Sequence, residues 1–191
     1  MREITTAVIF AGGKSSRMGE DKALLPFAGY PTLTEFQLDK LSSLFDEVYI
    51  SAKENKFDFN CRVIRDNYPE NSPLVGLISV FETLDAEEVF VLSVDAPFVA
   101  KETIEKLLEQ NENGLDVIVA QSPSGVQPLC GLYKRSILPL AYRQLEKKNH
   151  RLGDLLQLAN TRFVAFDEDT PFTNLNRPEE YQQALKTFEK R

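Results

Sequence analysis

Residues 10–22 of this chain read FAGGKSSRMGEDK, and they directly follow the apolar run AVI at residues 7–9. A short apolar run that ends in a loop rich in glycine and hydroxyl side chains is typical of a β-strand leading into a phosphate-binding loop. Glycine allows the backbone to turn sharply and brings its N–H groups close to an oxyanion. Lys14, Arg17 and Lys22 add positive charge around the same point. We therefore expect the phosphates of a ligand to bind after the first strand.

Two commoner phosphate-binding loops do not fit this stretch. The Walker loop requires a glycine five positions before its Gly-Lys-Ser, but Val8 occupies that position. The dinucleotide fingerprint G-x-G-x-x-G fails because Gly12 and Gly13 are adjacent. An ordinary glycine-rich turn between a strand and a helix is the remaining alternative, and the hydroxyl and basic residues that follow argue against it.

Composition and length indicate an ordinary globular protein. The chain has 191 residues, with 42% hydrophobic and 27% charged residues, so we expect one domain over residues 1–191. Its longest strongly apolar stretch, residues 89–94, is too short to span a bilayer, and we see no signal peptide. Cys61 and Cys130 have no metal-like spacing, so we expect reduced, partly buried thiols. A cytoplasmic protein without membrane contact is the prediction.

Charge and histidine content exclude several kinds of function. A net charge of −7 argues against nucleic-acid binding, which depends on neutralising phosphates with basic side chains. An anionic substrate is still compatible with this charge if basic residues gather locally and a divalent cation supplies the rest. His150 is the only histidine, so histidine-based zinc chemistry and Ser-His-Asp catalysis are not expected.

Hydrophobic periodicity predicts that strands and helices alternate along the chain. The expected strands are residues 5–10, 47–51, 62–65, 89–94, 116–120, 129–133 and 162–166. The expected helices are residues 33–45, 74–84, a segment around 104–108, 136–147, 152–159, and a last helix from Asn176 with an Asn-x-x-Glu capping box completed by Glu179. This alternation predicts an α/β fold with a mostly parallel central sheet and helices on both faces. Such sheets bind ligands at the carboxyl ends of their strands.

Two carboxylates follow predicted strands directly. Asp95 comes after the apolar run 89–94, and we expect it to bind Mg²⁺, which prefers oxygen ligands and uses one or two carboxylates together with substrate phosphates. The alternative is a turn residue, because aspartate followed by proline two positions later is common in turns. Asp66 follows residues 63–65, and the alternative for it is a helix cap or a turn.

The motif G-G-x-S-x-R-M-G-x-D-K, residues 12–22, resembles the signature of nucleotidyltransferases that join a nucleoside monophosphate to a phosphorylated acceptor. Within that group the chain resembles the molybdenum cofactor guanylyltransferases. The resemblance implies a three-layer, Rossmann-like fold with GTP and molybdopterin as substrates and Mg²⁺ as cofactor. The implied reaction transfers GMP from GTP to the phosphate of molybdenum-molybdopterin and releases pyrophosphate. Transient contact with other proteins of molybdenum cofactor biosynthesis is also implied.

The same resemblance implies roles for individual residues. Lys22, Arg17 and Asp95 are the implied catalytic residues, and Asp95 is the implied metal ligand. The implied nucleotide-binding residues are Phe10, Ala11, Gly12, Gly13, Lys22, Ser51, Asp66, Gly76 and Asp95.

A residue of the first loop indicates which nucleotide base the protein prefers. Gly12 stands where related cytidylyltransferases carry alanine, and a missing Cβ leaves room for a purine, which favours guanine over cytosine. Phe10 departs from the usual leucine, and Ser51 departs from the asparagine often found at that strand end.

The sequence marks the residues implied for acceptor binding less specifically. Asn174 and Asn176 match an N-x-N-x-P-E element of the family, and Arg151 belongs to the basic run 147–151. Such a run is more often a solvated face, and Asn176 has a plain alternative role as a helix cap. A cytidylyltransferase of molybdopterin, a sugar-phosphate nucleotidyltransferase and a non-enzymatic nucleotide-binding regulatory domain remain alternatives.

Overall fold

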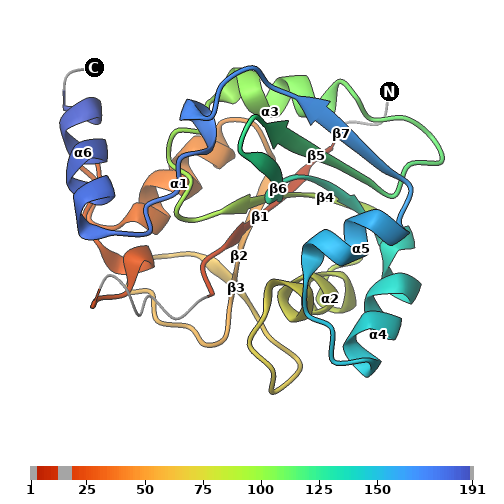
Figure 1. Ribbon diagram of the computed structural model, residues 1–191. Helices are drawn as coiled ribbons and strands as arrows, with labels where there is room; N and C mark the ends of the chain where they lie inside the picture. The colour runs from red at the N-terminus through yellow and green to blue at the C-terminus, as the bar shows by residue number, and fades with distance from the viewer. Residues whose placement is uncertain (1–3, 13–18, 190–191) are drawn as a thin grey trace.

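The computed structural model describes residues 4–12 and 19–189, which form a twisted sheet flanked by helices (Figure 1). The strands are β1 (Thr6–Phe10), β2 (Glu47–Ala52), β3 (Arg62–Arg65), β4 (Glu88–Ser93), β5 (Val117–Ser122), β6 (Gly125–Lys134) and β7 (Thr161–Ala165). The helices are α1 (Leu33–Ser42), α2 (Pro73–Thr83), α3 (Lys101–Leu108), α4 (Leu138–Glu146), α5 (Leu152–Leu158) and α6 (Pro178–Phe188).

The strand order within the described residues is β3-β2-β1-β4-β6-β5-β7. All neighbouring strands pair in parallel except β6, which is antiparallel to both β4 and β5. The prediction of a mostly parallel α/β sheet is confirmed. β6 begins at Gly125 rather than at Leu129, because residues 123–124 form a tight hairpin that lets it pair with β5 from its first residue.

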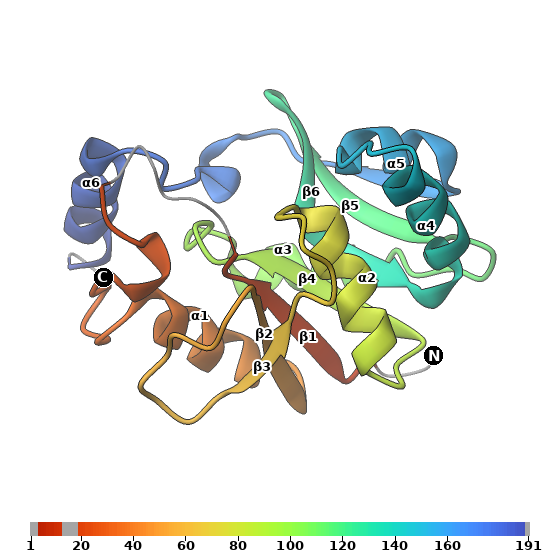
Figure 2. The same ribbon diagram turned by 90° about the horizontal axis from the view of Figure 1, so that it is seen from below.

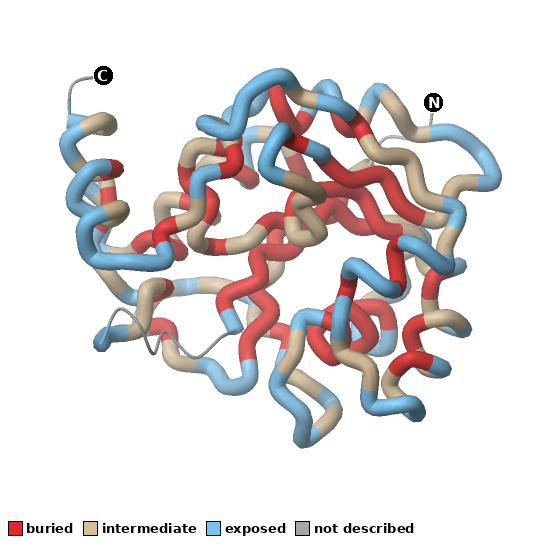
Figure 3. The backbone as a smooth tube through the Cα atoms, in the orientation of Figure 1, coloured by how far each residue is buried: buried red, intermediate tan, exposed pale blue. Residues whose placement is uncertain are grey.

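Helices cover both faces of the sheet, and alternate residues of β1 show this directly. Ala7 and Ile9 belong to a core shared with α1, α3 and α6, whereas Val8 and Phe10 belong to a core shared with α2, α4 and α5. Figure 2 shows α1 and α6 to one side of the sheet and α2, α4 and α5 to the other. The three-layer prediction is therefore confirmed, and β1, β2, β4 and β5 are buried along most of their length (Figure 3).

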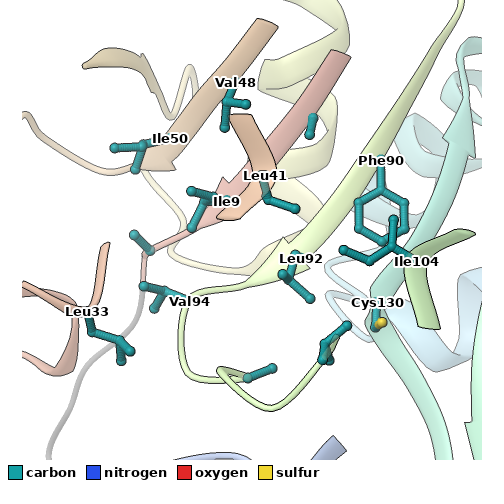
Figure 4. Packing of buried hydrophobic residues seen from close by; sticks show 14 of the residues in the cluster. Ile9, Leu33, Leu41, Val48, Ile50, Phe90, Leu92, Val94, Ile104 and Cys130 are labelled. Carbon is teal, nitrogen blue, oxygen red and sulfur yellow. The ribbon is translucent and has the colours of Figure 1, made fainter. Parts of the chain in front are cut away.

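Two helix starts follow the capping rules of their local sequence. Thr32 accepts a hydrogen bond from the N–H of Glu35 before α1, and Ser72 accepts one from Val75 before α2. Leu33 and Leu41 of α1 belong to the same buried cluster as the strand residues Ile9 and Leu92, and all four are labelled in Figure 4. α1 ends at Ser42, three residues before the predicted end.

The predicted cap of the last helix is wrong by one residue. Arg177, and not Asn176, precedes the first helical residue, Pro178. The partner is Glu180 rather than Glu179, and its carboxylate accepts the N–H groups of Asn176 and Arg177 at 2.7 and 2.9 Å. Sequence spacing does not distinguish two adjacent glutamates, because only the direction in which the chain enters the helix decides which of them reaches back.

The two cysteines form no disulfide, as expected for reduced thiols, and Cys61 is half-buried whereas Cys130 is buried. Cys61 and Cys130 are both free thiols. Among the described residues, every helix is too short or too polar to cross a bilayer.

Gly131 of β6 packs directly against the backbone of β5. A Cβ at this position would lie 2.2 Å from the carbonyl oxygen of Ile118 and 2.8 Å from the Cα of Val119. Because backbone atoms of a central strand do not move aside, we expect Gly131→Ala to destabilise the protein by about 1–3 kcal/mol or more. Thermal or urea unfolding measures this, with Gly153→Ala as the control, because a Cβ there meets nothing within 4 Å. Equal stability of the two variants contradicts the packing argument.

Candidate active site

Lys22 and Asp95 meet at the carboxyl ends of the central strands. Asp95 follows β4, and Lys22 begins a single 3-10 turn, Lys22–Leu24, whose N-cap Asp21 accepts the N–H of Ala23. The Lys22 ammonium lies 2.6 Å from Asp95 Oδ2, and both side chains are largely buried. The other carboxylate oxygen, Oδ1, accepts the Ser93 hydroxyl at 2.6 Å. The two charged groups singled out from the sequence therefore share one site, although 73 residues separate them.

The segment before α6 completes this cluster. The Leu175 N–H donates to the Asp95 carbonyl at 2.9 Å, and Asn176 Oδ1 accepts a hydrogen bond from the Lys22 ammonium at 3.1 Å. α6 itself is attached to the residues that follow Lys22, because the Tyr181 hydroxyl donates to the carbonyl of Pro26. Asn176 therefore touches the charged pair directly and is more than a residue near a helix end.

Three adjoining cavities open around Leu129, which lines all three. The first, about 440 Å³, is lined by Phe10, Gly12, Ser51, Asp66, Asn71, Ser72, Pro73, Gly76 and Leu129. The second, about 200 Å³, is lined by Phe10, Ala11, Gly12, Asp21, Lys22, Ala23, Ser93, Val94, Asp95 and Leu129. The third, about 330 Å³, is lined by Pro73, Ser93, Asp95, Ala96, Val99, residues 127–130, Leu152, Gly153, Phe172 and Asn174. Shared residues join them into one crevice, with the Lys22–Asp95 pair in its middle.

The first cavity gathers the residues expected to bind the base and ribose. Phe10 and Ser51 lie at the ends of neighbouring strands, and Gly76 lies in the first turn of α2. A Cβ added at Gly12 would meet no atom within 4 Å, so the space beside this residue is open. Burial raises the pKa of the Asp66 carboxyl, and the positive charge of Lys53 opposes this rise. The cavity thus offers an apolar wall, an open edge at Gly12 and one partly buried carboxyl.

Gly76 gives a test of this cavity. A Cβ there would lie 2.9 Å from the Phe10 ring and 3.0 Å from Ser51 Oγ, so Gly76→Ala displaces two side chains that line the cavity. We expect the KM for GTP to rise by about tenfold, equivalent to about 1.4 kcal/mol of binding. Steady-state kinetics at saturating acceptor measure this, with Lys101→Ala, an exposed substitution in α3, as the control. An unchanged KM for GTP in a folded Gly76→Ala protein contradicts the assignment of the cavity.

The residues predicted for the acceptor divide between two places. Asn174 lines the third cavity beside Asp95. Arg151 is exposed and immediately precedes Leu152 and Gly153, which line the same cavity. The buried Gln144 amide fixes this turn by donating to the carbonyls of Asn149 and Arg151 at 3.3 and 3.2 Å. The structure therefore places Arg151 at the rim and Asn174 inside.

Three residues singled out from the sequence, Gly13, Lys14 and Arg17, lie outside the described residues. One residue that the sequence reasoning missed is Lys56, from the connection between β2 and β3. Its ammonium contacts the carbonyl oxygen of Ala11 at 3.2 Å and also the Asp21 carboxylate. Lys56 therefore links the residues on either side of the glycine-rich loop. No motif marks this lysine, because its partners are 45 and 35 residues away along the chain.

A larger hollow, about 1100 Å³, lies at the opposite edge of the sheet, where the strands begin. Its lining includes Glu47, Glu87, Glu88 and Glu112. Carboxylates repel a triphosphate, and the amino ends of parallel strands are not the edge at which such sheets bind ligands. We therefore assign the chemistry to the crevice around Leu129.

Comparison with known proteins identifies the family. A family model described as "MobA-like NTP transferase domain" matches residues 7–163. The chain belongs to this family. A molybdenum cofactor guanylyltransferase from Campylobacter jejuni (strain RM1221) is 41% identical over 178 residues, covering 92% of this chain and 93% of the relative. One from Helicobacter pylori (strain J99 / ATCC 700824) is 36% identical over 185 residues, covering 94% of this chain and 87% of the relative. The chain is thus a nucleotidyltransferase of the molybdenum cofactor guanylyltransferase family.

The fold agrees with this assignment. The crystal structure of molybdopterin-guanine dinucleotide biosynthesis protein A from Archaeoglobus fulgidus superposes with a TM-score of 0.85 at 21% identity. The match covers 98% of this chain and all of that structure. At this identity the likeness shows the nucleotidyltransferase fold, and the functional assignment of individual residues depends on the site itself.

Proposed function

We propose that the crevice around Leu129 transfers GMP from GTP to the phosphate of molybdenum-molybdopterin, forming the guanine dinucleotide and releasing pyrophosphate. The observation that carries this proposal is the Lys22–Asp95–Asn176 cluster, which lies between the cavity of Phe10, Gly12 and Asp66 and the cavity of Asn174. In this arrangement the base and ribose occupy the first cavity and the acceptor occupies the third. The α-phosphate then lies at the cluster, where both substrates meet.

The chemistry needs little proton transfer. The acceptor phosphate carries about −1.5 to −2 charge at pH 7 and is already a nucleophile. Its attack on the α-phosphorus breaks the bond to pyrophosphate, so no general base is required. The difficulty is to bring two anions together and to stabilise the charge of the transition state, which depends on positioning and electrostatics. The one histidine, His150, pairs with Ser72, the N-cap of α2. This fits a reaction that requires no general base.

Among the described residues, Lys22 is the cation best placed to stabilise the charge of the transition state. Its ammonium lies in the middle of the crevice, where it would contact the α-phosphate or the departing pyrophosphate. The Asp21 carboxylate lines the same cavity, but its two oxygens are engaged by the N–H of Ala23 and by Lys56. Lys56 therefore neutralises a charge that would otherwise repel the triphosphate.

The residues around Asp95 suit Mg²⁺. Among the described residues no cluster of three or more His, Cys, Asp or Glu side chains forms a complete metal cage. One carboxylate with neighbouring amide oxygens matches Mg²⁺, which takes few protein ligands and completes its coordination with water and phosphate. Asp95 would hold the ion, with amide oxygens available from Asn174, which lines the same cavity, and from Asn176, which contacts Lys22. The bound ion would supply charge neutralisation at the phosphate oxygens.

Location and partners belong to the same proposal. We place the reaction in the cytoplasm. We also infer transient contact with other proteins of molybdenum cofactor biosynthesis, because the acceptor must be received from such proteins and the product handed on to them. Co-purification of the full chain with its crosslinked neighbours tests the contact.

A nucleotide and acceptor panel tests the function. The purified protein is incubated with GTP, CTP, ATP or UTP, with Mg²⁺, and with molybdopterin that does or does not carry molybdenum. We expect pyrophosphate and the guanine dinucleotide, with Lys22→Ala as the inactive control. A preference for CTP would identify a cytidylyltransferase instead. GTP binding without pyrophosphate release from any acceptor would indicate a regulatory nucleotide-binding domain.

A further inference from the structure

Helix α1 contributes no residue to the crevice, but two of its polar side chains reach the segment that carries Asp95. Gln37 Nε2 donates to the carbonyls of Ser93 and Val94 at 3.3 and 3.1 Å. One turn later, Lys40 Nζ donates to the carbonyls of Pro97 and Val99 at 3.3 and 2.9 Å. Residues three apart share one face of a helix. Four carbonyl groups, two on each side of Asp95, thus accept hydrogen bonds from a single face of α1.

The segment 93–99 needs this support because its own hydrogen bonds are long. The N–H of Ala96 lies 3.3 Å from the Ser93 carbonyl, and the N–H of Val99 lies 3.4 Å from the Ala96 carbonyl. Ordinary N–H···O bonds are about 2.9–3.0 Å. Its shorter attachments come from elsewhere, through the bond from Val94 N–H to Phe10 (3.0 Å) and the bond from Leu175 N–H to the Asp95 carbonyl (2.9 Å). The conformation around Asp95 is therefore imposed by neighbouring elements rather than by the turn itself.

Both α1 side chains are costly to bury, which argues that they do more than fill space. Gln37 is fully buried, and among the described residues its Oε1 has no hydrogen-bond partner. Burial lowers the pKa of Lys40 to about 7, although the Cys130 thiol of β6 opposes this shift. The Lys40 ammonium also lies 5.4 Å from the centre of the Phe36 ring. An apolar residue at either position would avoid these costs but would remove the side-chain donors to the carbonyls of Val94, Pro97 and Val99.

We propose that Gln37 and Lys40 are positioning residues, which hold the backbone on both sides of Asp95 so that its carboxylate faces Lys22 and the substrate phosphates. This inference rests on the proposed function, because it gives Asp95 its role toward Mg²⁺. Neither side chain lines the three cavities. Both act through the backbone that they hold, and neither contacts the reacting atoms.

The first test compares Lys40→Met with a matched control. Lys106 of α3 also donates to a backbone carbonyl, that of Ala165 at 2.9 Å, and also lies over a ring, that of Phe166. Neither Lys106 nor Phe166 lines the three cavities, and Lys106 donates to no carbonyl of residues 93–99 in the described hydrogen bonds. We expect Lys40→Met to speed amide hydrogen exchange in residues 93–99 by at least about tenfold, and Lys106→Met to leave it unchanged. In pyrophosphate-release assays, Lys40→Met should raise the half-saturating Mg²⁺ concentration by at least about fivefold, with the KM for GTP within about twofold of wild type. Lys40→Arg, which keeps charge and donors, should restore part of both effects.

Gln37→Leu provides a second variant if Lys40→Met does not fold. It removes the donor to Ser93 and Val94 together with the unpartnered oxygen, so we expect a folded protein with the same faster exchange at residues 93–99 and the same Mg²⁺ shift. Wild-type exchange and Mg²⁺ response in both variants would overturn the inference. Faster exchange spread evenly over the whole sheet, without a Mg²⁺ shift, would also overturn it, because that pattern indicates general destabilisation. A wild-type enzyme that releases no pyrophosphate would contradict the proposed function instead, and local exchange at residues 93–99 would then decide this inference alone.

Discussion

Replacing Lys22 with alanine is expected to slow GMP transfer by about 10²- to 10³-fold, the usual loss when a preorganised donor to transition-state charge is removed. The ammonium lies in the middle of the crevice, 2.6 Å from Asp95 and 3.1 Å from Asn176 Oδ1. These contacts hold it in place before any charge develops, so little reorganisation is needed during the reaction. Single-turnover pyrophosphate release with saturating GTP and acceptor measures the loss.

The control for this variant is Lys101→Ala. Lys101 is an exposed lysine of α3 in an i,i+4 pair with Glu105 at 3.7 Å, and its removal should change the rate by less than about twofold. A rate for Lys22→Ala within threefold of wild type would show that Lys22 serves only as the ion-pair partner of Asp95.

Asp95→Asn is expected to fold normally and to lose Mg²⁺-dependent turnover by at least about 10²-fold, because a bound cation contributes several kcal/mol to such a transition state. Asparagine keeps the shape of the side chain and can still accept the Ser93 hydroxyl, but it removes the negative charge that would hold a cation. The effect should appear as a changed Mg²⁺ titration at constant GTP, with circular dichroism confirming the fold.

Asp39→Asn is the matched control for this substitution. Asp39 accepts the Tyr30 hydroxyl on the exposed side of α1, where a lost charge has no reason to alter catalysis. Identical Mg²⁺ titrations for Asp95→Asn and wild type would remove Asp95 from the metal site.

The double variant Lys22→Ala with Asp95→Asn separates two explanations. Because the two side chains touch, their effects should not add. If the Lys22 variant is impaired only because Asp95 is left unpaired, the double variant should be as active as Asp95→Asn alone. If both groups act on the phosphates, the double variant should be slower than either single variant.

Much of the fold could be predicted from local sequence. The alternation of strands and helices and the buried β4 both follow from side-chain size and apolarity along the chain. The start of β6 could not be predicted in the same way, because it is set by pairing with β5 from Gly125 onward. The cap of α6 could not be predicted either, because Glu180 reaches the N–H of Asn176 only after α6 has docked.

The residues of the site also divide into those that local sequence could predict and those that it could not. Lys22 and Asp95 were predictable because each follows a recognisable local pattern, a glycine-rich loop and a strand end. Lys56, Gln37 and Lys40 were not, since each donates to backbone carbonyls 45–59 residues away along the chain.

By itself the sequence determined the class of fold and the chemical types available for the reaction, and it predicted phosphate binding at the first loop. These are properties of side chains and of short-range periodicity, which act over a few residues. Only the tertiary structure decided that Lys22, Asp95 and Asn176 meet, and that α1 holds the segment between β4 and α3. Such contacts join segments up to 154 residues apart, and they exist only after the sheet has paired and the helices have packed on it.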